Sequence, residues 1–437
     1  MVGDQALRDR ILRVVDDLRD ELIDVTRRLI QIPTENKPPK GYEKEGQEYI
    51  AGLYSRLGVE LDVFLPTEVE GIEDHPGYLK GRDYRDRPNV VARLRGEGGG
   101  RSLILSGHMD TSPKEPLPWS RYDPFSGAVE GDRIYGRGGF DMKGGLAAAY
   151  IAAEAVLDAG VKLKGDLILE SVVDEEYGGA NGTLAARLRG YEADAAILME
   201  CSSLAICPAN RGDKNWLITI RGVPGMPYTG YEPTNPVYGM ARIIEALRNY
   251  EVIRNEKTPR HPLYRDEPIP LPVLIKKLKA GEVEPEGALG LPRDCWLLVG
   301  PQFYPGMSEE EFDREFLGFM KAVVDTDPIL SRNPPTISSS EPYIRRIVEP
   351  SEIDRDHPIV KTVEAAFQEA TGREGMVKGA PFPCDAFIFT KYSRTPVLVF
   401  GPAGENAHAP DEYVTISSLL ALTKTLALTI LKWCGHR

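Results

Sequence analysis

The feature that most constrains the fold is an alternation of apolar, strand-like segments with helix-like segments over the first 210 residues. The run SLILSGHMD has no polar face and predicts a strand that is buried on both sides. Helical periodicity at 146–159 and 183–189 separates two further strand segments, 166–173 and 194–199. This order predicts an α/β fold with a mainly parallel sheet and helices on both faces. On such a sheet, functional side chains lie at the carboxyl ends of the strands.

The pattern changes after residue 210. The strand-like WLITIRG is followed by helical segments at 237–250 and 308–324, with an irregular charged segment at 256–292 and the strand CWLLVG between them. The α/β pattern then returns with a helix at 357–371, a strand at 396–400 and a helix at 417–433. We therefore expect one α/β domain made of residues 1–210 and 337–437, interrupted by a smaller α+β domain at 211–336.

The charge balance excludes some classes of partner. The formal net charge is −13, which argues against nucleic acid or an anionic membrane as the main partner and makes a buried cation the more natural partner. The first 33 residues mix acids and bases at helical spacing and lack the apolar core of a signal peptide. The five cysteines include no CxxC pair, so neither a disulfide framework nor a cysteine zinc site is indicated. These features predict a cytoplasmic protein.

Five short motifs carry carboxylate or imidazole side chains where predicted strands end. They are GHMDTSP with His108 and Asp110, GRGGFDMKGG with Asp141, VVDEEYGG with Glu175 and Glu176, LMECSS with Glu200, and FGPAGENAHAPDEYV with His408. Carboxylates gathered at one edge repel each other, whereas two divalent cations would neutralise them. Mixed imidazole and carboxylate ligands favour zinc, with cobalt, manganese or nickel as alternatives.

The neighbouring residues Glu175 and Glu176 can take different roles, because adjacent side chains at a strand end point to opposite sides. One carboxylate can bind metal while the other stays free. A free carboxylate beside a metal-bound water is what a hydrolase needs to move a proton from the water to the leaving nitrogen.

The order and context of HMDT, GGFDMKGG, the strand-ending DEE and AHAPDEY resemble the aminoacylase, carboxypeptidase G and succinyl-diaminopimelate desuccinylase family of two-metal hydrolases. The resemblance implies a zinc-exopeptidase-like catalytic domain with a lid that often forms a homodimer. It implies a cis peptide between Asp141 and Met142, with Glu175 as the general base and Asp110 orienting His108. It implies five metal ligands: Asp141 bridging both metals, His108 and Glu200 at one metal, and Glu176 and His408 at the other.

The lid departs from the family pattern at two positions. Met226 occupies the position of a family histidine that stabilises the oxyanion, and a thioether cannot donate a hydrogen bond. Gln302 occupies the position of an arginine that often grips the substrate carboxylate, and it carries no charge. Asn235 matches a family asparagine, and Arg211 is a further candidate for substrate binding. A standard acylated amino acid or peptide C-terminus is therefore a less secure prediction for the substrate, and a flat or uncharged substrate stays open as an alternative.

The sequence thus predicts a metal-dependent hydrolase of an amide or related C–N bond in a small molecule, acting through a metal-bridged hydroxide with Glu175 as base. Hydrolytic deamination of an aromatic amine, or cleavage of another non-peptide C–N bond, stays open as an alternative. So does a non-catalytic metal-binding relative, although binding alone would not require the free base Glu175. A dinucleotide site at GRGGFDMKGG is disfavoured, because the motif lacks GxGxxG spacing.

Overall fold

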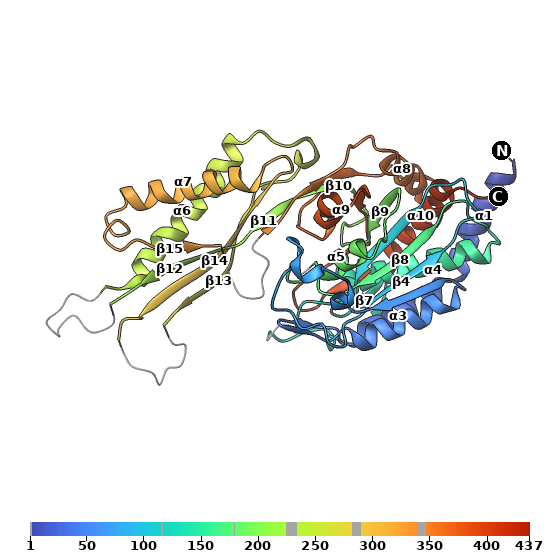
Figure 1. Ribbon diagram of the computed structural model, residues 1–437, viewed down its shortest axis with the longest axis horizontal. Coiled ribbons are helices and arrows are strands. Elements are labelled where there is room, and N and C mark those ends of the chain that lie inside the picture. The colour runs from blue at the N-terminus through green and yellow to red at the C-terminus, as the bar shows by residue number, and fades with distance from the viewer. Residues whose placement is uncertain (1, 115–116, 179, 224–233, 282–289, 340–346) are drawn as a thin grey trace. The chain divides into compact units, whose positions relative to one another are not determined.

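The computed structural model describes residues 2–114, 117–178, 180–223, 234–281, 290–339 and 347–437. The chain divides into a larger unit, Met1–Asn210, Ser351–Ala380 and Cys384–Arg437, and a smaller unit, Arg211–Pro350 and Pro381–Pro383 (Figure 1). The return to the larger unit comes at Ser351 rather than at 337, because strands β15 (Thr336–Ser338) and β16 (Ile347–Val348) both pair within the smaller unit.

A nine-stranded sheet forms the centre of the larger unit, in the order β17-β10-β19-β9-β5-β8-β4-β3 with β18 beside β10. Its strands are β3 Glu60–Phe64, β4 Asn89–Leu94, β5 Leu103–His108, β8 Leu167–Val172, β9 Ala195–Leu198, β10 Ile206–Asn210, β17 Ser351–Glu352, β18 Val377–Ala380 and β19 Val397–Val399. The four middle strands β19, β9, β5 and β8 run parallel, whereas β4, β3 and β10 pair antiparallel to their inner neighbours. The predicted α/β fold with a mainly parallel centre is confirmed.

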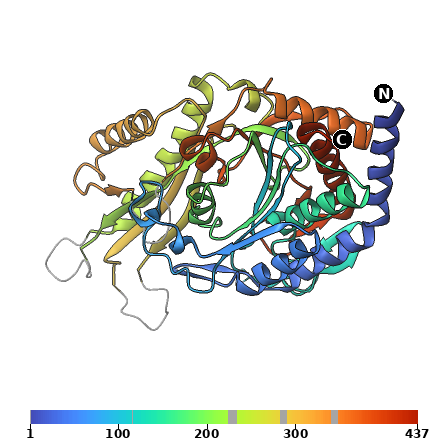
Figure 2. The ribbon, with the colours of Figure 1, turned by 45° about the vertical axis from the view of Figure 1, so that its right-hand side comes forward.

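Helices cover both faces of this sheet. One face carries α1 Val2–Asp17, α2 Arg19–Gln31, α3 Lys44–Arg56, α4 Gly144–Asp158, α8 Pro358–Thr371 and α10 Ile416–Cys434, and the other carries α5 Asn181–Leu188 and α9 Ala386–Tyr392. Successive side chains of β8 point to opposite faces of the sheet. Leu169 packs in the core with α4, whereas Glu170 forms a buried ion pair with Arg187 of α5. The two ends of the chain lie close together, because α1 packs against α10 (Figure 2). Helix α10 is long and apolar enough to cross a membrane, but 72% of its apolar window is buried inside the protein.

A second, four-stranded sheet joins two distant parts of the larger unit. It has the order β20-β21-β7-β6, formed by β6 Ala128–Glu130, β7 Arg133–Tyr135, β20 Gly404–Glu405 and β21 Tyr413–Thr415. Pairing of β7 with β21 brings the segment after Tyr135 beside the loop that links β20 to β21. The two-stranded sheet of β1 Asn36–Lys37 and β2 Lys40–Gly41 completes the unit's strands within the described ranges.

The smaller unit is an antiparallel sheet with two long helices. Its strands are β11 Gly212–Lys214, β12 Trp216–Arg221, β13 Val273–Ala280, β14 Asp294–Phe303, β15 and β16, and its helices are α6 Pro236–Lys257 and α7 Glu309–Thr326. The strand β13 lies inside the segment 256–292 that was predicted to be irregular. That prediction was wrong, because β13 is an exposed, lysine-rich strand that pairs with β14, and its apolar and polar residues do not alternate regularly in the sequence.

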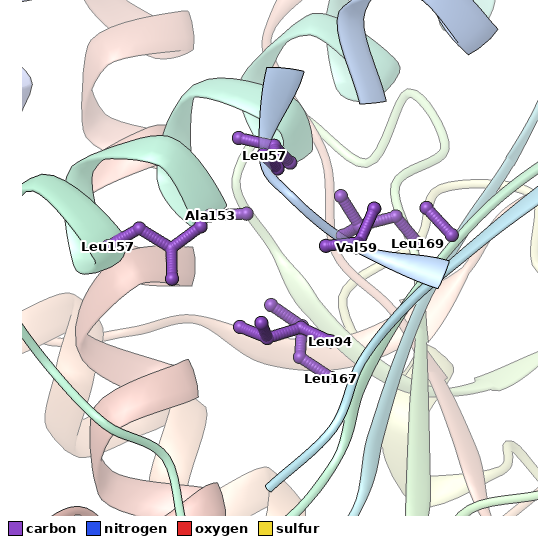
Figure 3. A pocket seen from close by; sticks show the side chains of 8 residues that line it. Leu57, Val59, Leu94, Ala153, Leu157, Leu167 and Leu169 are labelled. Atoms are coloured by element: carbon purple, nitrogen blue, oxygen red, sulfur yellow. The ribbon is translucent and has the colours of Figure 1, made fainter. Parts of the chain in front are cut away.

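A small apolar cavity of about 10 Å³ lies in the core of the larger unit (Figure 3). It is lined by Leu57, Val59, Ala92, Leu94, Ala153, Leu157, Leu167 and Leu169. A water needs roughly 10–15 Å³ and polar partners, and this lining offers none. Since Leu167 begins β8, the cavity lies at the amino ends of the parallel strands, and it is a feature of packing.

Candidate metal centre

The carboxyl ends of the middle strands bring acidic and imidazole side chains to one edge of the central sheet. β5 ends at His108, β8 is followed by Glu175 and Glu176, and β9 is followed by Glu200. The strands are aligned, since His108 pairs with Val172 at the end of β8. The sheet itself therefore supplies four of the predicted site residues.

Asp141 and His408 are brought to the same edge by segments that lie outside the central sheet. Asp141 does not follow a strand of the central sheet but lies in the short turn Gly139–Lys143, which leads into α4. His408 lies in the loop between β20 and β21. The peptide between Asp141 and Met142 is cis, as the resemblance implied.

Asp141 lies between the two histidines. One of its oxygens, Oδ1, is 3.4 Å from Nε2 of His108, and the other, Oδ2, is 3.1 Å from Nε2 of His408. Nε2 of His108 also lies 3.5 Å from Oε1 of Glu200 and 3.9 Å from Oε2 of Glu175. Nε2 of His408 lies 2.8 Å from Oε2 of Glu176. The side chains thus form two adjacent groups that share Asp141.

These groups have the composition and spacing of a site for divalent cations. The ligand atoms of His108, Glu175 and Glu200 lie within 4.8 Å of one another, and so do those of Asp141, Glu176 and His408. Nε2 of His108 is buried and has no hydrogen-bond partner among the described residues, and the buried Oε2 of Glu176 faces Nε2 of His408 at 2.8 Å. A buried polar atom without a partner is costly, and a metal ion would satisfy Nε2 of His108. The residues present therefore fit a pair of divalent cations.

The electrostatics show the same demand for positive charge. The pKa of Glu175 is raised well above its usual range, first by burial, against the opposing effect of His108 and with the help of Asp385. The Glu176 carboxylate raises the pKa of His408 well above its usual value. Burial would lower the pKa of His108, but neighbouring carboxylates outweigh burial and raise it. The carboxylates of this cluster therefore favour positive charge on the two histidines. Bound metal cations would supply that positive charge in place of the protons.

Asp110 contacts both His108 and the segment after β8. Its backbone carbonyl oxygen lies 2.8 Å from Nδ1 of His108, while its carboxylate Oδ1 is 3.6 Å away. The carboxylate instead accepts hydrogen bonds from the N–H groups of Glu175 and Glu176, at 3.1 and 3.0 Å, and from Asn36 at 2.9 Å. With Nδ1 as the donor to the carbonyl oxygen, Nε2 of His108 faces the cluster, where a bound cation would take the place of its proton.

Sequence reasoning missed Glu412. This buried carboxylate accepts hydrogen bonds from Arg137 at 2.7 Å and from the N–H groups of Phe140 and Asp141 at 3.0 and 3.2 Å. It thereby ties the turn that carries Asp141 to strand β21. Burial raises the pKa of Glu412 to about 7. The signal was present in the motif AHAPDEY, but nothing in the local sequence distinguishes this buried acid from the half-buried Asp411 before it.

Glu412→Ala is expected to lower the free energy of unfolding by roughly 3–5 kcal/mol, because it leaves Arg137 buried without its carboxylate partner. Urea unfolding measures this change. The control is Glu130→Ala, which removes an exposed carboxylate 3.9 Å from Arg121 and should cost less than about 1 kcal/mol. Equal effects of the two substitutions would contradict the role assigned to Glu412.

Arg211, one of the predicted substrate residues, lies in the smaller unit and donates to backbone carbonyls. Its guanidinium contacts the carbonyl oxygens of Ile269 at 3.3 Å, Pro270 at 2.6 Å and Pro381. Burial lowers its pKa. These contacts tie three segments of the smaller unit together.

The other predicted substrate residues also belong to the smaller unit. Asn235 caps α6 by accepting a hydrogen bond from the N–H of Val237 at 3.0 Å. Gln302 lies in β14 and is 4% exposed. Met226 lies outside the described residues. The described contacts of Asn235 are those of a helix cap, and the substrate-binding roles of all three stay predictions.

Comparisons with known proteins bear on the whole chain. Residues 104–432 match the profile of peptidase family M20/M25/M40. An N-formyl-4-amino-5-aminomethyl-2-methylpyrimidine deformylase from Halalkalibacterium halodurans is 28% identical over 451 residues, covering 98% of both proteins. An acetylornithine deacetylase from Pectobacterium carotovorum is 26% identical over 422 residues, covering 95% of this chain and 98% of that protein. Human carnosine dipeptidase 1 shares the fold, with a TM-score of 0.75 at 15% identity over 98% of this chain and 99% of that one.

Proposed function

The chain belongs to peptidase family M20/M25/M40, and from this premise we propose that it removes a small acyl group, a formyl group first of all, from an amine on an aromatic or heterocyclic small molecule. As a family member it is a metal-dependent hydrolase of C–N bonds in small molecules. The observation that carries the hydrolytic activity in this proposal is the position of Asp141 between His108 and His408, with Glu175 beside them.

Five side chains would hold two divalent cations, with zinc preferred for this donor set and cobalt or manganese as alternatives. They are Asp141 between the cations, His108 and Glu200 on one side, and Glu176 and His408 on the other. When bound, such cations lower the pKa of water and polarise a carbonyl group.

Glu175 is the general base in this proposal. It accepts a proton from the attacking water and delivers it to the leaving nitrogen as the C–N bond breaks, so that the products are the carboxylic acid and the free amine. Its carboxylate is 17% exposed, which leaves it open to substrate. The neighbouring Glu176 is engaged instead, since it accepts a hydrogen bond from the N–H of Ser112 at 2.6 Å and faces His408.

Two observations support a substrate without a free carboxylate. Gln302 stands at the position where the family often has a carboxylate-binding arginine, and a buried glutamine offers no charge for an ion pair. The relative from Halalkalibacterium halodurans, similar along almost the whole chain, is named for deformylating an aminomethylpyrimidine. We extend that substrate class to this chain.

The test is a panel of matched substrates with protein of known metal content. One heteroaromatic amine is prepared as its N-formyl, N-acetyl and N-succinyl derivatives, together with an N-formyl amino acid. We expect close to two metals per chain and a kcat/KM for the N-formyl heteroaromatic amine at least about tenfold above that for the N-formyl amino acid. Preference for the amino acid would refute the proposed substrate class. Absence of all C–N cleavage at full metal content would refute the activity.

The smaller unit offers a surface for a homodimer, which we include in the proposal. Its strand β13 exposes Leu274, Ile275 and Leu278, each more than 40% accessible. Ile275 and Leu278 lie opposite Val299 and Leu297 of β14, so they share one face of the sheet, and exposed apolar residues on one face mark an association surface. Sedimentation equilibrium giving twice the chain mass of 48.4 kDa supports this, and a monomer refutes it. We also propose a reducing, cytoplasmic location, because all five cysteines are free thiols.

A further inference from the structure

Asp174, immediately before the proposed base, is a buried carboxylate that belongs to neither group of the metal centre. Its side chain is fully buried and its backbone φ is 69°, a left-handed conformation that the surroundings must maintain in a residue other than glycine. Tyr84 donates its hydroxyl to Oδ2 at 2.5 Å. Arg87 and Asn36 donate to Oδ1 at 3.1 and 3.0 Å. Three donors from other segments therefore fix this carboxylate.

Two arginines surround Asp174. Arg87 forms a two-pronged ion pair with Glu43, at 2.8 and 2.6 Å, in addition to its bond to Asp174. Arg82 is fully buried, and its Nε lies 3.5 Å from Oδ2 of Asp174. Its guanidinium has no hydrogen-bond partner among the described residues, and it lies 5.9 Å from the ring centre of Tyr177. A buried cation without other acceptors makes the position of Asp174 costly to change.

The same network reaches the backbone of the proposed base. Asn36 donates to both Asp174 and Asp110, at 3.0 and 2.9 Å. The Asp110 carboxylate in turn accepts from the N–H groups of Glu175 and Glu176. The backbone at Glu175 is thus held on one side by Asp110 and on the other by the fixed side chain of the preceding residue.

We propose that Tyr84, Arg82 and Arg87 are positioning residues that clamp Asp174 and thereby hold Glu175 in its working place beside the metal centre. The proposal rests on the proposed role of Glu175 as general base. Within the described residues, the ion pairs and side-chain hydrogen bonds of Tyr84, Arg82 and Arg87 reach Asp174 and Glu43 but not His108, His408 or Glu200. Their effect on Glu175 would therefore pass through the backbone of the segment after β8.

Tyr84→Phe tests the clamp, because it removes one hydroxyl donor with little change in volume. We expect kcat to fall by roughly 10–100-fold, as small misplacements of a catalytic group do, while KM and metal content stay unchanged. Hydrogen exchange of the amides of residues 174–178 should become faster. Tyr54→Phe is the matched control, since Tyr54 is also fully buried in the larger unit and its hydroxyl has no hydrogen-bond partner among the described residues. Arg82→Met is a second variant with the same expected pattern.

The readouts separate this proposal from the proposed function. If wild-type protein cleaves none of the panel, the function fails, yet Tyr84→Phe must still accelerate exchange at 174–178 for the clamp to stand. If Tyr84→Phe and Arg82→Met match Tyr54→Phe in both kcat and exchange, the clamp is refuted. A fall in kcat without faster exchange at these amides also refutes it, because the effect would then arise elsewhere.

Discussion

Glu175→Gln is expected to reduce turnover by about 10²–10⁴-fold while the protein keeps its full metal content, because an amide cannot accept the proton of the attacking water. The geometry separates this residue from its neighbour. Oε2 of Glu175 lies 3.9 Å from the nearest histidine nitrogen, at His108, whereas Oε2 of Glu176 lies 2.8 Å from Nε2 of His408. The measurement is kcat on the best substrate of the panel, with elemental analysis of the same preparation.

The neighbouring substitution Glu176→Gln is the matched control. It makes the same chemical change one residue along the chain, and it should lower metal content by about one ion per chain because Glu176 faces His408 within the second group. The assignment of roles would be reversed if Glu175→Gln lost metal and Glu176→Gln kept it. Turnover within about tenfold of wild type for Glu175→Gln, with metal bound, would remove it as the base.

Four residues of the site could be predicted from the sequence because of one regular property of parallel sheets. Parallel strands in register end at the same edge, so His108, Glu175, Glu176 and Glu200 could be expected to meet once their apolar strands were recognised. His408 and Asp141 come together for a reason the local pattern does not contain. Their approach depends on the pairing of β7 with β21, short strands about 280 residues apart. The sequence motifs placed both residues at strand ends, whereas Asp141 lies in a turn and His408 in the loop between β20 and β21.

The polar network behind the site was not predictable from the sequence. Asn36 and Asp174 are separated by 138 residues, and Tyr84 and Asp174 by 90, so no spacing rule relates them. In the smaller unit, two residues that were predicted to bind substrate make structural contacts. Asn235 was chosen by its position in the family pattern and Arg211 as a further polar residue of the lid. Their described contacts cap a helix and bind backbone carbonyls, and a sequence does not show which polar groups the fold itself uses.

Asp141→Ala should have the largest effect on metal binding, with loss of both ions and a fall in activity of more than about 100-fold. Substitutions of residues that only hold a metal ligand in place already cost roughly 10–100-fold, and Asp141 would be a direct ligand of both cations. In the described chain it is the only carboxylate with oxygens within 4 Å of both His108 and His408. Its backbone N–H bond to Glu412 does not depend on the side chain, so the turn is expected to keep its place.

His408→Ala is the comparison variant, which should lose less metal than Asp141→Ala. His408 is 54% exposed and faces only the group shared with Glu176, so its removal should release one ion and leave the group around His108 able to bind. Metal titration of chelated protein, followed by reconstitution, distinguishes the two variants from wild type. A single ion lost from Asp141→Ala would mean that the two groups bind independently, and the carboxylate between the histidines would then not be the bridge on which the proposed chemistry depends.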